Sequence, residues 1–252
     1  MDLKLIIKRV FLPIFIIVFC IITVLIATSI YEAQGGNPLT KENTEISETI
    51  FTCQSTSKNV AYAYLRGFGD HNPNAFDFQR GLIGDNAILD FTYDETLTLN
   101  ELTEEFISQF NTFAANQDVE EIIIIGQSAG GVIAANAASE LLFEQKIELH
   151  TLASPLNGYH IPHAFLGEEV GFAKEIATGF TSFRDPQENI KTYHHKTIND
   201  EESESYCGSA KAFCNGLKIQ QNNLVGSTEY FYDHTHTSIM QAVSQLVIDC
   251  HS

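Results

Sequence analysis

The segment from Glu121 to Gly131 constrains the fold of this chain more than any other. Its first part contains four consecutive isoleucines without a polar interruption. Such a run predicts a central strand that is covered on both faces, as in a parallel sheet. The next residues read Gly-x-Ser-x-Gly around Ser128, the spacing of a sharp turn from a strand into a helix. Residues 132–143 are rich in alanine and leucine and predict that helix.

Other strands and helices alternate along the chain in the way expected of a doubly wound parallel sheet. The stretch between residues 97 and 117 has apolar residues at helical spacing, which predicts a helix packed on the sheet. A final helix should end near Asp249. The expected strands cover residues 59–65, 87–93, 147–153, 190–198 and 229–232.

Gly-x-Ser-x-Gly also occurs by chance as a plain glycine turn, so its surroundings decide its meaning. Here a strand precedes the motif and a helix follows it, which is the context of a nucleophile elbow. On these residues, the chain from about 59 to 250 resembles the α/β-hydrolases, most closely the small lipases and esterases. The resemblance implies an α/β fold with a mostly parallel sheet, helices on both faces and Ser128 as the nucleophile.

The first expected strand ends in Arg66-Gly67-Phe68-Gly69-Asp70. In the lipase and esterase families, the corresponding turn supplies one backbone N–H of the oxyanion hole, and the residue after the nucleophile supplies the other. The resemblance therefore implies Phe68 and Ala129 as the donors. Arg66 stands where a histidine often precedes the first glycine, and an ordinary glycine loop remains the alternative.

The triad order in this fold is serine, then an acid, then histidine. Histidine just before the last helix fits this order, and the resemblance favours His236, which is followed by a polar pair and an aliphatic residue, over His234. Asp200 follows the penultimate strand and is the expected acid. The alternatives for the acid are Glu201, Glu202 and Asp185.

Residues 159–189 depart from the strand and helix pattern of the core. Several phenylalanines and aliphatic residues lie there among acidic ones, which predicts one or two helices. We expect either a cap over the active site or an ordinary helix that covers the sheet. In lipase-like relatives, a small residue and a proline after a strand line the rim of the site, as Ser154-Pro155 would here.

The N-terminus predicts a membrane segment. Three basic residues precede an uncharged run from Val10 to Ile30, long enough to span a bilayer and longer than most signal-peptide cores. We expect residues 1–33 to be a retained anchor or a cleaved signal, and the rest to be extracytoplasmic. Residues 34–58 predict a linker, and residues 59–252 the hydrolase domain.

Four cysteines follow the membrane segment: Cys53, Cys207, Cys214 and Cys250. An even number in an exported chain predicts two disulfides. Cys207 with Cys214 would close a short loop, and Cys53 with Cys250 would join the two ends of the domain. Four buried thiols are the alternative.

The net charge is −18, and the first ten residues carry three basic side chains and one acidic side chain, so the remainder is more acidic still. Such a surface repels nucleic acid and anionic lipid headgroups. We expect a serine hydrolase of small-molecule or lipid esters that needs no organic cofactor or metal. An acyltransferase or thioesterase would use the same triad, and a catalytically silent relative that binds a lipid or a protein is the third possibility.

Overall fold

A computed structural model of the chain describes residues 48–53, 57–68, 76–161, 171–180, 182–198, 200 and 219–251. The chain divides into two units, Met1–Glu45 and Ile46–Ser252, and all described residues lie in the second. The expected membrane segment and the expected Cys207–Cys214 pair therefore lie outside the described residues. In the part that is described, no helix is both long enough and apolar enough to cross a bilayer.

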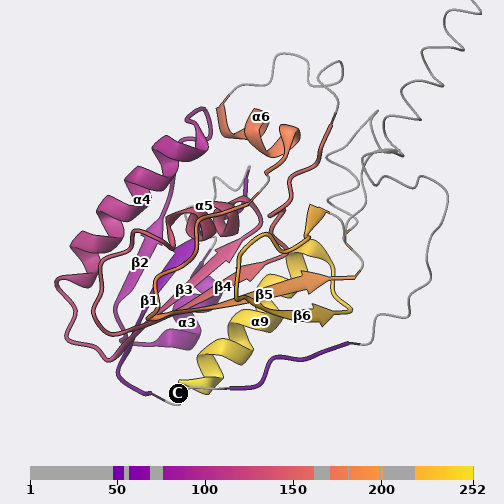
Figure 1. Ribbon diagram of the computed structural model, residues 1–252. Helices are drawn as coiled ribbons and strands as arrows, with labels where there is room; N and C mark the ends of the chain where they lie inside the picture. The colour runs from indigo at the N-terminus through magenta and orange to yellow at the C-terminus, as the bar shows by residue number, and fades with distance from the viewer. Residues whose placement is uncertain are drawn as a thin grey trace, which may run out of the picture. The chain divides into compact units, whose positions relative to one another are not determined.

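A parallel sheet forms the centre of the described unit (Figure 1). Its strand order is β2-β1-β3-β4-β5-β6, and all neighbouring pairs are parallel. The chain runs from β1 outward to β2 and then returns to the other side of β1, so the winding reverses between β1 and β3. Ligands of open parallel sheets bind at the carboxyl ends of the strands at such a point. The strands are β1 (Val60–Leu65), β2 (Ile88–Phe91), β3 (Glu121–Gln127), β4 (Lys146–Leu152), β5 (Ile190–Thr197) and β6 (Thr228–Tyr232).

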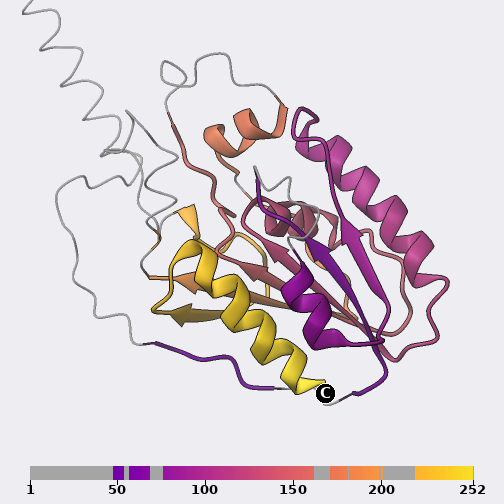
Figure 2. The same ribbon diagram turned by 180° about the vertical axis from the view of Figure 1, so that it is seen from behind.

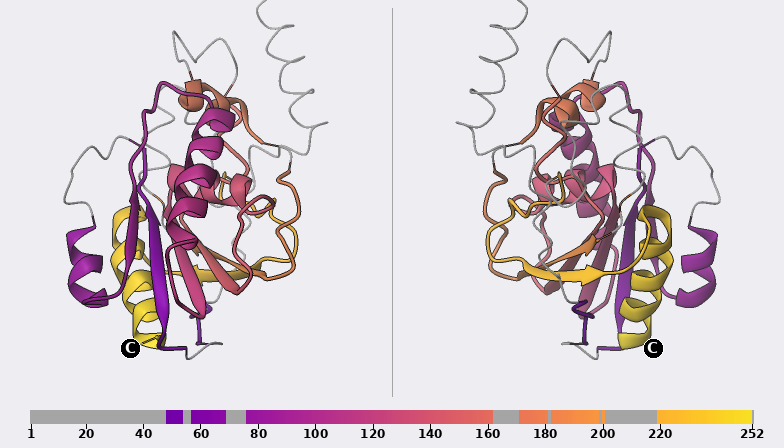
Figure 3. Two further views of the ribbon diagram at one scale, coloured as in Figure 1. Left: turned by 90° about the vertical axis from the view of Figure 1, so that its left-hand side faces the viewer. Right: turned by 90° about the vertical axis from the view of Figure 1, so that its right-hand side faces the viewer.

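Helices cover both faces of the sheet, as predicted. One face is covered by α4 (Leu99–Ala114) and α5 (Ala129–Ala137) (Figure 3), and the other by α3 (Asp77–Ile83) and α9 (His236–Cys250) (Figure 2). The sequence did not predict α3, which is short and buries only Gln79 and Ile83. Helix α5 ends six residues before the expected Phe143, because residues 138–140 form a turn.

The isoleucine run of β3 explains why the sheet needs two covered faces. Ile122 and Ile124 lie in the apolar core that α4 and α5 cover, whereas Ile123 and Ile125 lie in the core on the side of α9. All four side chains are completely buried. Because successive side chains of a strand point to opposite faces, an unbroken apolar run is stable only between two layers.

Residues 48–53 fall in the segment predicted as a linker, yet they lie against the domain. Thr49 forms an antiparallel bridge with Phe231 of β6, and the Phe51 side chain is buried in the core on the α9 side. Cys53 forms a disulfide with Cys250 at the end of α9, which confirms that predicted pair. The described part of the domain therefore begins before residue 59.

Candidate active site

Ser128 occupies the turn between β3 and α5 in a strained backbone conformation. Its φ is 50° and its ψ is −121°, a region that residues with a side chain rarely adopt. The Ser128 N–H donates to the carbonyl of Leu152 at the end of β4 at 2.8 Å. Backbone strain of this kind is concentrated at functional sites, since surrounding structure must hold it in place.

The glycines around Ser128 are required by close backbone contacts. A Cβ atom on Gly130 would lie 2.4 Å from the carbonyl oxygen of Arg66, and one on Gly126 would lie 2.6 Å from the Cα atom of Gly131. Neither contact can be relieved by moving a flexible side chain. The turn therefore brings the start of α5 directly against the end of β1, and the glycine pattern of the motif has a steric cause.

The turn after β1 runs beside the serine. A Cβ atom on Gly67 would lie 3.3 Å from the Cβ of Ser128, and Phe68 follows directly. Ala129 is the first residue of α5, where the N–H groups have no partner within the helix and the helix dipole is positive. Both predicted oxyanion donors are thus in segments that adjoin Ser128.

Arg66, which stands where lipases and esterases often have a histidine, is buried and holds this turn to the carboxyl end of β2. Its Nη2 donates to the carbonyl of Tyr93 at 2.8 Å, and the Tyr93 hydroxyl donates to the carbonyl of Arg66 at 3.1 Å. Glu95 lies 3.6 Å from Nη1. The guanidinium therefore connects the carboxyl ends of β1 and β2.

His236 and Asp200 are in contact. The His236 Nδ1 lies 3.2 Å from the Asp200 Oδ2, and the two side chains are 8% and 0% exposed. Thr235 caps α9 by accepting a hydrogen bond from the N–H of Ser238, so His236 is the first residue of the helix. His234 instead has its Nδ1 3.3 Å from the Ser238 hydroxyl.

Of the alternatives for the acid, only Asp185 lies among the described residues. Asp185 is exposed before β5, and Glu201 and Glu202 lie outside the described residues. No hydrogen bond joins the Ser128 side chain to His236 in the described part of the chain. Such bonds are often long in enzymes without substrate. Among the described residues, the structure thus brings the histidine and the acid together without a bond from the serine to this histidine.

Helix α6 (Gly171–Thr178) belongs to the segment 159–189 that could cap the site. The N–H of Phe172 donates to the carbonyl of Leu97, just before α4 begins, and α4 begins at the carboxyl edge of the sheet. Figure 1 shows α6 at this edge, beside the start of α4. It lies at the same edge as Ser128, as a cap would; its role as a cap remains a prediction.

The face of the sheet under α9 holds a buried polar chain that the sequence reasoning missed. The His150 Nδ1 lies 3.0 Å from the His195 Nε2, and the His195 Nδ1 lies 3.0 Å from the Tyr232 hydroxyl. At the other end, the His150 Nε2 is 3.5 Å from Glu148. Burial lowers the pKa of both histidines, so both are neutral. The sequence signal for this polar chain was the alternation of polar and apolar residues in β4. Because both faces of that strand are covered, its polar side chains are buried and need hydrogen-bond partners.

The pKa of Glu148 is held well below its usual range. Burial alone would raise it, but hydrogen bonds from His150, His251 and Lys146 outweigh burial. The Glu148 carboxylate is therefore charged, with the Lys146 ammonium and the rings of His150 and His251 as its hydrogen-bond donors. No three His, Cys, Asp or Glu side chains of the described ranges are placed to hold a metal ion.

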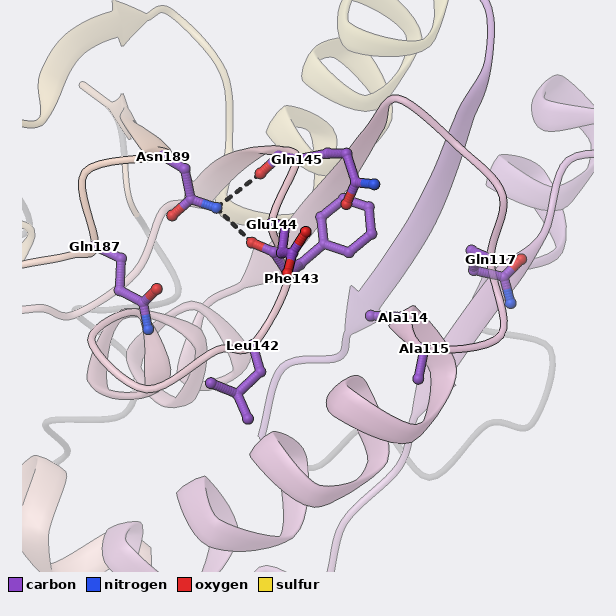
Figure 4. A pocket seen from close by; sticks show the side chains of 9 residues that line it. All are labelled: Ala114, Ala115, Gln117, Leu142, Phe143, Glu144, Gln145, Gln187 and Asn189. Carbon is purple, nitrogen blue, oxygen red and sulfur yellow. Dashed lines mark hydrogen bonds between the residues drawn. The ribbon is translucent and has the colours of Figure 1, made fainter.

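A cavity of about 660 Å³ opens at the opposite edge of the sheet (Figure 4). It lies between the end of α4, the loop before β4 and residues 187–189 before β5. The Asn189 side chain donates to the carbonyls of Phe143 and Gln145 on its wall, at 2.6 and 2.7 Å. Because these residues adjoin the amino ends of the strands, the cavity is separate from the site around Ser128.

No protein-family model and no curated protein sequence matches the chain. Solved structures do. The fold is similar to that of a lipase-esterase related protein from Clostridium acetobutylicum ATCC 824, with a TM-score of 0.50 and 11% identity over 77% of this chain and 94% of that one.

Two further solved structures are similar at lower scores. An esterase from Exiguobacterium antarcticum has a TM-score of 0.47 and 11% identity, with 79% of this chain and 94% of that one covered. MenH from S. aureus has a TM-score of 0.46 and 11% identity, with 81% and 97% covered. The parallel sheet, the strained serine turn after β3 and the likeness to the Clostridium protein show that the described domain has the α/β-hydrolase fold.

Proposed function

We propose that the protein is a serine hydrolase of carboxylic esters in which Ser128 is the nucleophile, His236 the general base and Asp200 the acid. The observation that carries the proposal is the buried hydrogen bond between His236 and Asp200, at the same edge of the sheet as the strained Ser128. A histidine oriented by a buried carboxylate is the arrangement that activates a serine hydroxyl.

The chemistry follows from which atoms are engaged. Because the His236 Nδ1 faces Asp200, Nε2 is the nitrogen that takes the Ser128 proton as Oγ attacks the ester carbonyl. The tetrahedral oxyanion accepts hydrogen bonds from the N–H groups of Phe68 and Ala129, and His236 returns the proton to the leaving alcohol. Water then attacks the acyl-enzyme by the same route, which releases the carboxylic acid product and restores the Ser128 hydroxyl.

An ester of a small molecule or lipid is the favoured substrate, because the sequence resembles lipases and esterases and the segment 159–189, which we propose as a cap, contains several phenylalanines and aliphatic residues. We also propose an extracytoplasmic location with membrane attachment through the N-terminal segment. The Cys53–Cys250 disulfide supports an oxidising compartment. The net charge of −18 opposes binding to nucleic acid.

A catalytically silent protein that binds a lipid or a partner protein is the second candidate. It is favoured by the absence of a hydrogen bond between Ser128 and His236 among the described residues. An acyltransferase or thioesterase would have the same reactive serine, and assays with thioesters and acceptor alcohols would separate these from the ester hydrolase.

The test is covalent labelling of the full-length chain with a fluorophosphonate probe, followed by peptide mapping with mass spectrometry. We expect modification of Ser128, which is lost in Ser128→Ala and reduced in His236→Ala. His234→Ala is the matched control, since this histidine contacts Ser238 and not Asp200, and it should keep the labelling rate. Folded protein that takes up no probe would refute the hydrolase and leave the silent protein.

A further inference from the structure

The side-chain amide of Gln220 contacts the same oxygen of the Asp200 carboxylate that faces His236. The Gln220 Nε2 donates to the Asp200 Oδ2 at 2.9 Å, and that oxygen also lies 3.2 Å from the His236 Nδ1. Gln220 is completely buried. The carboxylate thus has a second donor whose direction restricts its rotation.

The orientation of this amide is determined by the end of β5. The N–H of Thr197 donates to the Gln220 Oε1 at 2.9 Å, and the Gln220 Nε2 also donates to the Thr197 carbonyl at 3.3 Å. A backbone N–H only donates and a carboxylate only accepts. The Gln220 Oε1 must therefore face the Thr197 N–H, and the Gln220 Nε2 must face the Asp200 carboxylate. An amide with its oxygen and nitrogen exchanged would lose both of these hydrogen bonds.

The backbone of Gln220 is held in turn by a histidine of β5. The His194 Nε2 lies 2.8 Å from the Gln220 carbonyl oxygen, and the His194 Nδ1 lies 2.6 Å from the Thr151 hydroxyl. Burial, with Lys196 nearby, lowers the pKa of His194 to about 4, so the ring is neutral at pH 7. Since a carbonyl only accepts, Nε2 carries the proton and Nδ1 accepts from Thr151.

We propose that Gln220 is a positioning residue of the hydrolase: its amide holds the Asp200 carboxylate in the orientation that His236 needs, and Thr151 and His194 hold Gln220 against the sheet. This inference rests on the proposed function. Residues of β4 and β5 and the segment after residue 218 form one directional chain of hydrogen bonds, from the Thr151 hydroxyl through His194 and Gln220 to Asp200.

The energetic reason is that the χ2 torsion of an aspartate has a broad minimum, so each directional hydrogen bond to the carboxylate narrows the range of orientations that it populates. A turned carboxylate would hold the imidazole off its line to Ser128, and small misplacements of catalytic groups cost about 100-fold in rate. In metal enzymes, residues that orient a metal-binding side chain through a hydrogen bond are worth about 10- to 100-fold in activity, and we expect a similar magnitude for a residue that orients the acid of a triad.

Two variants separate positioning from folding. Gln220→Met removes the donor and keeps the volume, and it should lower kcat for p-nitrophenyl acetate by about 10- to 100-fold with KM unchanged. Gln220→Glu keeps the acceptor for the Thr197 N–H but places an acid against Asp200. Because two adjacent carboxyl groups share a proton at raised pKa, its bond to Asp200 re-forms as the pH falls.

The activity of Gln220→Glu relative to the unmodified protein should therefore rise about tenfold between pH 9 and pH 6. A merely structural role of the amide would leave this ratio constant. The matched control is Asn223→Leu, which removes an amide that ties the same segment to the carbonyls of Leu156 and Phe180 and does not contact Asp200. It should keep kcat.

The outcomes are distinguishable. If the unmodified full-length chain hydrolyses the ester and Gln220→Met stays within twofold of it, or if the Gln220→Glu ratio is constant with pH, the positioning role is wrong and the hydrolase remains. If the unmodified chain neither hydrolyses esters nor is labelled at Ser128, the proposed function is wrong and this inference with it. A loss of kcat in Gln220→Met together with a pH-dependent ratio would support both.

Discussion

The disulfide between Cys53 and Cys250 should contribute a large part of the stability of the domain. Replacing both cysteines with serine removes a cross-link between residues 197 positions apart. Loop-closure entropy for a loop of this length corresponds to about 5 kcal/mol at 25 °C. Other effects of the change are small, because Cys53 is exposed. The Cys250 sulfur, which carries no hydrogen in the disulfide, lies 3.1 Å from the Leu246 carbonyl oxygen, so the hydroxyl of a serine at 250 can donate to that oxygen.

We expect the double variant to lose about 3–5 kcal/mol of free energy of unfolding, measured by urea denaturation without reductant and followed by circular dichroism. Adding a reductant should destabilise the unmodified protein by at least this amount, whereas the variant should lose only the contribution of the Cys207–Cys214 pair, about 2.5 kcal/mol, if that pair is bonded. Ester hydrolysis without denaturant should be retained, because Cys250 ends α9 and His236 begins it, so the cross-link lies at the far end of that helix from the site.

A second double variant, Cys207→Ser with Cys214→Ser, provides the comparison. If that pair is bonded as predicted, its loop is short and its loss should cost only about 2.5 kcal/mol. A loss below about 1 kcal/mol for the Cys53 and Cys250 variant would refute the reasoning, since it would mean that the two ends of the domain remain together in the unfolded chain without the cross-link.

Two other consequences follow from the geometry. Gly130→Ala should abolish ester hydrolysis and lower the denaturation midpoint, because the added Cβ would lie 2.4 Å from the Arg66 carbonyl oxygen. In the control Gly81→Ala, the added Cβ has no atom within 4 Å, so neither the activity nor the midpoint should change. His251 has a raised pKa: burial opposes the shift, but hydrogen bonds to Glu148 and the Ser57 carbonyl outweigh it. Its contribution to stability is thus complete below the unfolded pKa of about 6.5 and lost as the pH rises through the raised value. His251→Gln should flatten the fall of the unfolding free energy above pH 6.5, and an unchanged slope in urea titrations would contradict this assignment.

The features that could be predicted from the sequence are those that contiguous residues specify. The isoleucines of β3 require two covered faces, and the glycines beside Ser128 require a tight turn, so these residues alone were enough to predict the parallel sheet and the strained serine. The Cys53–Cys250 pair could be predicted because cysteines are few. Helix α3 could not, because only two of its side chains are buried and its periodic signal is correspondingly weak.

By itself the sequence determined the α/β fold, the position of the serine turn and a short set of candidate partners for Ser128. Only the tertiary structure decided that His236, and not His234, meets Asp200, and that Gln220 supports the same carboxylate. The physical reason is distance along the chain: the Asp200 contacts with His236 and Gln220 span 36 and 20 residues. Local patterns specify strands and turns, whereas the direction of a buried hydrogen bond depends on how the packed sheet brings distant segments together.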